Sequence, residues 1–254
     1  MSSFTGRTPR GGAPDQSHAE TRGGVALAEA SLRRAQAASP MSPGVGLYNE
    51  LLRAIASAAA AGKATAEDAQ EVLARMESAS VTPDGDSLRL LLEASACDAR
   101  RGQGGGIAAV NDVMNRMKAA GGKATDLGVF TAALSCLAAD AGGGGGATGR
   151  DGERVLERIR AEGLLPDVSC YNAQLEVIAR AARHGRARVS EGLAVLKRMR
   201  AEGLDADITT FRSLMDITAW CARRGRAGLK DAEAVVSRPA PHQTISGLIP
   251  PTSG

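Results

Sequence analysis

The chain has 254 residues, a formal net charge of +3 and an aromatic content of only 2%. So few rings argue against a large globular core built on aromatic side chains, and a core of Ala, Leu, Val and Met favours small, closely packed helices. The charge permits a nucleic-acid partner without requiring one. This length suits one large domain or one elongated array.

Several classes of site and activity are excluded by residue pattern. No cysteine forms a C-x-x-C pair and only three histidines occur, so we expect no metal site and no other cofactor. The sequence contains no apolar stretch of about 20 residues, which is the length needed to span a membrane. Without clustered carboxylates or a nucleophile–base pair, we predict no enzymatic activity. Buried, reduced thiols are expected at Cys97, Cys136, Cys170 and Cys221.

The N-terminal segment precedes the regular part of the chain. Residues 1–24 are expected to be disordered or transit-like, because the first 14 contain arginine, Ser, Thr and Gly but no acid. A helix is predicted from about Val25 to Ala38. Its Arg34 lies 41 residues before Arg75, which makes 25–44 the second half of an incomplete leading repeat.

An internal repeat is the strongest feature of the sequence. Four of the six aromatic residues share one register, and an apolar pair, an arginine and an acid recur in step with them. The aromatic register comprises Tyr48, Phe130, Tyr171 and Phe211, with Leu88 at the midpoint of the first interval. The arginine register comprises Arg75, Arg116, Arg158, Arg198 and Arg238. The steps of 40–42 residues predict about five repeats.

Each repeat is predicted to hold two helices, the first starting near the aromatic and the second following a Gly-rich break. Thr65 and Asp68 suit the start of such a second helix, as N-cap and acidic third residue. The fold class is therefore all-α, an α-solenoid of helix–turn–helix repeats forming a right-handed superhelix with a concave face. Repeats 1 to 4 cover 45–84, 85–126, 127–167 and 168–207, a partial repeat 5 covers 208–238, and 239–254 is an unstructured tail.

Three further expectations concern particular positions. Leu52, Leu92, Leu134, Leu175 and Met215 occupy one inner position of the five first helices. Gly121, Gly163 and Gly203 are expected to end second helices as C-caps. The run 142–146 is all glycine, and we expect a flexible linker rather than a phosphate-binding loop, because no Gly-Lys-Ser/Thr ending follows and no strand precedes it.

The repeated phrases resemble those of a known family. Repeat 4 is entered through Arg160-Ala-Glu-Gly-Leu-Leu-Pro-Asp-Val-Ser-Cys-Tyr-Asn172, and its second helix contains Leu196-Lys-Arg-Met199. These phrases resemble the pentatricopeptide repeat over about 45–238. The tetratricopeptide pattern is absent. Repeat 2 departs from the family, with Leu88 for the aromatic and Thr125 for the proline.

The resemblance implies single-stranded RNA binding at about one base per repeat. In the family, the residue after the opening aromatic and the last residue of the repeat read the base. Repeats 1 and 4 would prefer uracil and repeat 3 guanine, whereas an arginine in repeats 2 and 5 could meet phosphate or stack on a base. The candidate residues are Asn49 with Asp84, Arg89 with Asp126, Thr131 with Asp167, Asn172 with Asp207, and Arg212. Val45, Val168 and Ile208 open their repeats, where the family uses apolar residues to sandwich bases.

Structural alternatives stand beside each assignment. The repeat-ending aspartates could cap the next helix, and both roles can coexist. The asparagines could be plain first-turn residues. We favour salt bridges or a solvated stripe over an RNA track for the arginine register, and packing over base stacking for the aromatics.

The functional expectation is sequence-preferring, U/G-leaning RNA binding in organelle RNA processing, stability or translation. The resemblance, with the composition of the first residues, suggests a mitochondrial or chloroplast location. The alternative is a protein–protein scaffold on the same solenoid, favoured by the modest charge, two arginines at reading positions and the small number of repeats.

Overall fold

The computed structural model describes residues 44–119 and 126–228, together with 25, 26, 28–30, 33, 34, 230, 231 and 233. The helices with defined bounds are α2 (Val45–Ala60), α3 (Ala66–Ser78), α4 (Gly85–Arg100), α5 (Gly106–Ala119), α6 (Leu127–Gly142), α7 (Gly149–Ala161), α8 (Val168–Arg183), α9 (Val189–Ala201) and α10 (Ile208–Arg223). No strand occurs within these described ranges. The predicted N-terminal segment 1–24 and tail 239–254 lie outside them, as do Gly121, Thr125 and Arg238.

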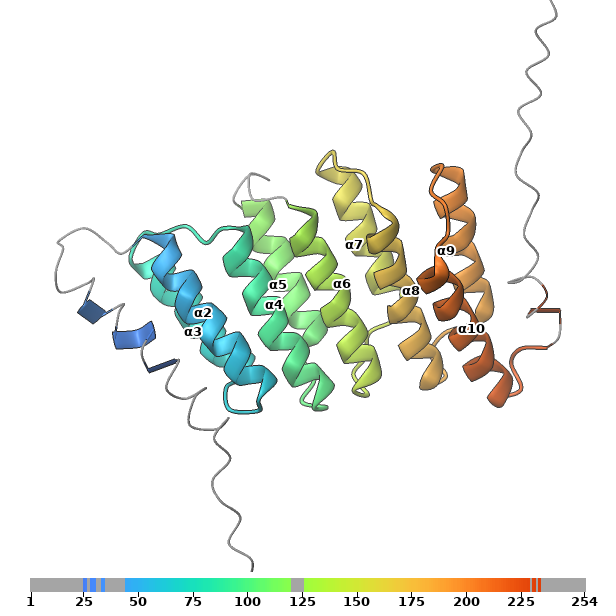
Figure 1. Cartoon of the computed structure of the whole chain (residues 1–254), viewed down its shortest axis with the longest axis horizontal. Coiled ribbons are helices and arrows are strands. Elements are labelled where there is room, and N and C mark those ends of the chain that lie inside the picture. The colour runs from blue at the N-terminus through green and yellow to red at the C-terminus, as the bar shows by residue number, and fades with distance from the viewer. Residues whose placement is uncertain are drawn as a thin grey trace, which may run out of the picture.

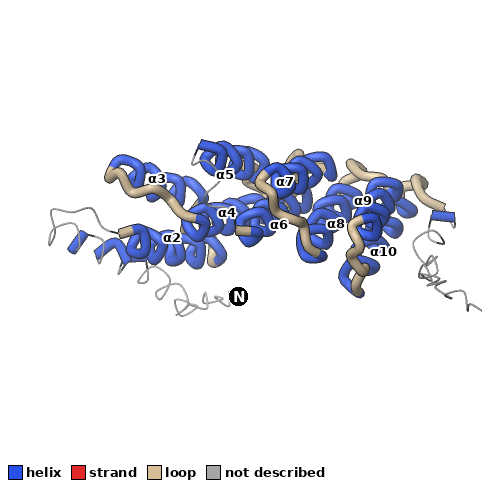
Figure 2. The backbone as a smooth tube through the Cα atoms, turned by 90° about the horizontal axis from the view of Figure 1, so that it is seen from above, coloured by secondary structure: helices blue, strands red, loops and turns tan. Residues whose placement is uncertain are grey.

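The helices form an elongated array two layers deep (Figures 1 and 2). The first helices of the repeats, α2, α4, α6, α8 and α10, pack side by side in one layer. Each second helix contacts two first helices, its own and the next, as α3 contacts α2 and α4. The expectation of an all-α repeat solenoid is confirmed.

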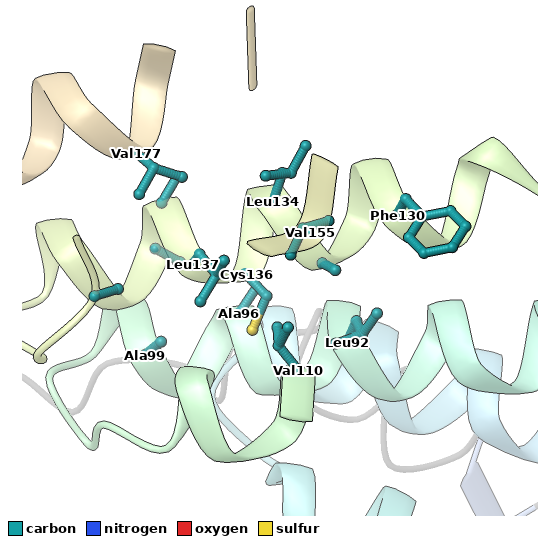
Figure 3. Close-up of a cluster of buried hydrophobic side chains, with 14 of the residues drawn as sticks. Leu92, Ala96, Ala99, Val110, Phe130, Leu134, Cys136, Leu137, Val155 and Val177 are labelled. Carbon is teal, nitrogen blue, oxygen red and sulfur yellow. The ribbon is translucent and has the colours of Figure 1, made fainter. Parts of the chain in front are cut away.

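One continuous hydrophobic core runs through the array between the two layers. Figure 3 shows part of it, with Leu134 of α6 beside Val155 of α7 and Phe130 further along α6. The aromatics of repeats 1, 3 and 4 are fully buried, which confirms that they pack rather than stack on a ligand. Small alanines fill much of the remaining contact between first helices, as the composition predicts.

The inner position of the first helices is confirmed in four repeats and wrong in the fifth. Leu52, Leu92, Leu134 and Leu175 are fully buried, but Met215 is 46% exposed. Leu134 and Leu175 face the second helices of their own repeats, near Gly152 of α7 and Gly192 of α9. Met215 belongs to α10, the last of the helices with defined bounds.

Left-handed residues end several second helices. Gly163 and Gly203 have φ of 77° and 75°, which confirms them as C-caps. In repeat 1 the same place is taken by Ser80, with φ of 58°. Its neighbour Val81 donates a backbone hydrogen bond of 2.8 Å to the carbonyl of Met76, so the cap closes as it does at glycine. A side chain is therefore held in a conformation that favours glycine.

Arginines and buried aspartates tie successive repeats together. Arg101 donates to the carbonyl of Ala59 at 2.7 Å, and so caps the C-terminal end of α2 from the following repeat. Arg186 and Arg226 also reach back to the preceding repeat, and each donates to a backbone carbonyl 41 residues earlier in the chain, that of Gly145 or Gly185. Such bonds fix the orientation of each repeat relative to its neighbour, and so keep the first helices aligned in one layer.

The glycine run after α6 is a packed turn, so the expected flexible linker is wrong. A Cβ at Gly143 would lie 1.9 Å from the carbonyl oxygen of Ala99, and one at Gly145 would lie 2.3 Å from the carboxylate of Asp140. That carboxylate is buried and accepts hydrogen bonds from the backbone N–H groups of Gly106 and Ala147. Glycine is required here because two backbones and a carboxylate approach too closely for any side chain.

The four cysteines are free and buried, as expected. Burial, assisted by the nearby charge of Asp140, raises the pKa of Cys136 to about 12. None of the described helices has the length and apolar character needed to cross a bilayer.

Candidate functional site

Two grooves lie along the layer of first helices. One, of about 830 Å³, is lined by α2, α4 and α6 and reaches the start of α8. The other, of about 610 Å³, is lined by α8 and α10. Ser169 borders both, so the two grooves follow one another along the same face. We call this surface the first-helix face.

In repeat 1 the structure brings the predicted pair together. The amide nitrogen Nδ2 of Asn49 donates to both carboxylate oxygens of Asp84, at 3.0 and 3.2 Å. Asp84 is also the N-cap of α4, because its side chain accepts from the backbone N–H of Ser87 at 2.9 Å. The Ser87 hydroxyl donates to the amide oxygen of Asn49 at 2.6 Å. The capping and pairing roles of the aspartate therefore coexist.

Repeat 4 repeats this arrangement. Nδ2 of Asn172 donates to the two carboxylate oxygens of Asp207, at 3.1 and 3.0 Å. Asp207 caps α10 by accepting from the backbone N–H of Thr210 at 2.8 Å, and the Thr210 hydroxyl donates to the Asn172 amide oxygen at 2.6 Å. Asn172 and Asp207 both line the groove between α8 and α10. We call each set of three side chains an amide lock: Asn49–Asp84–Ser87 and Asn172–Asp207–Thr210.

Both lock carboxylates are charged at neutral pH. The hydrogen bond from the Thr210 backbone is the main reason that the pKa of Asp207 lies below its ordinary value. Burial would raise the pKa of Asp84, but hydrogen bonds from Ser87 and Asn49 outweigh it and the pKa is again lowered. Each lock therefore presents an anionic acceptor beside a neutral amide.

The two predicted residues of repeat 3 line the groove but do not hydrogen-bond to each other. The Thr131 hydroxyl donates to the carbonyl of Leu127 at 2.9 Å, within its own helix. Asp167 caps α8 by accepting from the backbone N–H of Cys170 at 2.8 Å. Both side chains border the groove, so a ligand could reach each of them separately.

The two arginines at reading positions differ from each other. Arg89 donates to Asp86 at 3.1 Å and forms a second ion pair with Glu93, both on α4, and not with Asp126. Asp126 caps α6 through the backbone N–H of Gly128 at 3.2 Å. Arg212 borders the second groove and forms no ion pair with any described residue.

The face carries further cationic groups. Four groove-lining arginines have no carboxylate partner among the described residues: Arg53, Arg100, Arg183 and Arg212. Trp220 lies at the edge of the second groove, with the guanidinium carbons of Arg223 and Arg183 4.7 and 5.6 Å from its ring centroid. At the start of α10, Ile208 is 88% exposed.

The described members of the arginine register line neither groove and all form salt bridges, which confirms the interpretation favoured from the sequence. Arg158 pairs with Glu162 of its own repeat. Arg116 pairs with Glu77 of the preceding repeat, and Arg198 pairs with Glu153 of the preceding repeat. Arg75 bonds Glu71 within its own helix at 2.6 Å.

Sequence reasoning missed Ser87, Thr210 and the cluster around Trp220. A signal for the hydroxyls exists: repeats 1 and 4 are followed by Asp-x-x-Ser/Thr, whereas repeats 2 and 3 are followed by Asp-x-x-Val129 and Asp-x-x-Cys170. The same spacing is a helix-capping pattern, which hides its second contact 38 residues back along the chain.

Comparisons with known proteins agree on the fold. No protein-family model and no curated protein matches the sequence. Among solved structures, the pentatricopeptide repeat protein PPR10 in complex with an 18-nucleotide psaJ RNA element matches with a TM-score of 0.52 and 16% identity, over 82% of this chain and 26% of that one. A triple Cys-to-Ser variant of PPR10 with the psaJ element gives the same values. This chain thus spans about a quarter of the length of those proteins. It has the helical-repeat solenoid fold of the pentatricopeptide repeat proteins.

Proposed function

We propose that this chain binds single-stranded RNA along the first-helix face, one base to a repeat, with uracil preferred at repeats 1 and 4. The observation that carries the proposal is the amide lock, which occurs twice with the same partners and nearly the same distances. The lock of repeat 4 lines a groove of the first-helix face, whereas Asn49 of repeat 1 is only 7% exposed. The similarity to a protein whose structure was solved with bound RNA supports the same partner.

The chemistry of the locks suits an unpaired base. Asn Nδ2 carries two hydrogens and directs one to the Asp carboxylate, which leaves one donor for a ligand. A carboxylate oxygen lies beside it as an acceptor. Uracil offers a carbonyl acceptor next to an N–H donor on its Watson–Crick edge, so the two patterns match. Repeat 3 offers a threonine hydroxyl and a separate carboxylate, for which we propose guanine.

The remaining arginines suit the backbone of the strand. Arg212 and Arg183, without carboxylate partners among the described residues, are proposed to meet phosphates. Arg89 is neutralised by two acids of its own helix, so we propose that repeat 2 adds little to base reading. Exposed Ile208 provides an apolar surface against which a base can pack.

Binding to short RNAs tests the proposal. The ligands are A-rich oligonucleotides with two uracils separated by two adenines, and the same oligonucleotides with adenine throughout. The parent chain is expected to prefer the uracil form, and Asn49→Ala/Asn172→Ala should remove that preference. The control Ser57→Ala changes another residue of the same face, outside every lock. Equal affinity of the parent chain for both RNAs would contradict the proposal. Salt-insensitive capture of a protein without RNA binding would favour the scaffold.

By the same resemblance we propose a role in organelle RNA processing, stability or translation, in the mitochondrion or chloroplast. Expression of the full sequence with a C-terminal fluorescent tag tests the location. Exclusion of the tag from both organelles would contradict it.

A further inference from the structure

The hydroxyls of the two amide locks are placed to fix the orientation of the reading amide. Ser87 and Thr210 are both fully buried, and each is the third residue of its helix. Each hydroxyl oxygen also accepts from the backbone N–H of its own N-cap aspartate, at 3.3 Å in repeat 1 and 3.2 Å in repeat 4. The hydroxyl proton has two acceptors within reach, the amide oxygen at 2.6 Å and a carboxylate oxygen of the N-cap aspartate at 3.0 Å, and the shorter contact is the one to the amide.

An asparagine amide can present either its oxygen or its nitrogen in a given direction, and its neighbours decide which. In each lock, a hydroxyl donates to the oxygen and a carboxylate accepts from the nitrogen. A half-turn of the amide would place its oxygen next to the carboxylate, so that two acceptors would face each other. It would also place the nitrogen, which can only donate, next to the hydroxyl proton. Both partners therefore favour one orientation, in which the ligand meets an N–H donor.

We propose that Ser87 and Thr210 are positioning residues that set the preference of repeats 1 and 4 for uracil over cytosine by holding this orientation. The inference rests on the proposed RNA-binding function. Uracil presents a carbonyl oxygen where cytosine presents an amino group, so a fixed N–H donor pairs with the first and opposes the second. An amide free to turn would accept from cytosine and lose the distinction.

Repeats 2 and 3 lack a hydroxyl at the equivalent position, the third residue of the following helix. Cys170 takes the equivalent place after repeat 3, and its sulfur lies 4.0 Å from the Thr131 hydroxyl. Val129 takes it after repeat 2 and offers no donor at all. Both reading residues are described for repeats 1 to 4. Among these four repeats, the hydroxyl occurs only in the two that have an asparagine at the reading position.

The test uses the double variant Ser87→Ala/Thr210→Val and a matched control, Ser95→Ala/Thr218→Val. The control removes two buried hydroxyls from the same two helices, where each donates only to a carbonyl of its own helix. Affinities are measured by fluorescence anisotropy for A-rich RNAs with two uracils separated by two adenines, and for the same RNAs with cytosine replacing uracil. The readout is the ratio of the two affinities, which a uniform loss of stability leaves unchanged.

We expect the uracil-to-cytosine ratio to fall about fivefold for each hydroxyl removed, about the effect of one hydrogen bond. The control should keep the parent ratio, and Ser87→Thr/Thr210→Ser should retain it. If the test variant keeps the ratio, the positioning role is wrong while RNA reading stands. If the control loses the ratio equally, the effect comes from general loosening and the inference is again wrong. A parent chain that binds neither RNA overturns both proposals. If the double variant does not fold, the single variants Ser87→Ala and Thr210→Val decide by the same ratio.

Discussion

The salt dependence of RNA binding can be worked out from the first-helix face. Four arginines line its grooves without a carboxylate partner among the described residues: Arg53, Arg100, Arg183 and Arg212. Each can neutralise one phosphate of a bound strand and so release counterions. For single strands the slope of log affinity on log salt is roughly −0.7 per phosphate, so four contacts give about −3. Between about 50 and 200 mM salt the affinity should then fall about 50-fold.

The variant Arg183→Gln/Arg212→Gln should halve that slope, because it removes two of the four contacts. The expected loss over the same salt range is then about sevenfold. Arg200→Gln is the control, since it removes an exposed arginine from α9 in the other layer. Anisotropy titrations at four salt concentrations measure each slope. A slope that Arg200→Gln lowers as much as the double variant would refute the assignment of the strand to this face.

Three further predictions concern the fold and its thiols. Gly143→Ala should lower the free energy of unfolding by about 1–3 kcal/mol, because its Cβ would lie 1.9 Å from the Ala99 carbonyl oxygen, whereas Gly146→Ala should have little effect; urea titrations of both test this. Ser80→Gly should raise the free energy of unfolding by about 0.5–1 kcal/mol, because relief of the left-handed strain outweighs the added entropy of the unfolded chain. A lower urea midpoint for this variant would contradict the prediction. Cys136, with its pKa raised to about 12, should resist a thiol reagent at pH 8 until the chain unfolds, and rapid labelling of the folded protein would disprove this.

The repeat and its helices could be predicted because their determinants are local and periodic. Buried Tyr171 and Leu175 recur at fixed places in the helix, and Asp207 is recognisable both as an N-cap and as the end of a repeat. The arginine register could be assigned to salt bridges or a solvated stripe because it recurs once per repeat on a charged helix face, where arginines commonly pair with neighbouring acids. These features depend on residues near one another in sequence or on the repeat period itself.

What sequence reasoning could not supply depends on contacts between repeats. Met215 shares its register with four buried leucines but is 46% exposed on α10, the last helix with defined bounds, and the register alone does not predict that difference. The glycines after α6 have the composition of a linker, and their necessity appears only when the Ala99 carbonyl is seen against Gly143. From the sequence, Thr210 is recognisable only as part of a helix-capping pattern. Its hydrogen bond to Asn172 of the preceding repeat is seen only in the structure.

The proposed function requires that an RNA strand lie along the first-helix face. Photo-crosslinking with a 4-thiouridine-containing, A-rich RNA, followed by mass spectrometry of the adducts, tests it most directly. Adducts are expected on α2, α8 and α10, around Asn49, Asn172 and Arg212, and they should fall when unlabelled uracil RNA competes. Adducts confined to α3, α5, α7 and α9, or unchanged by the competitor, would contradict the account.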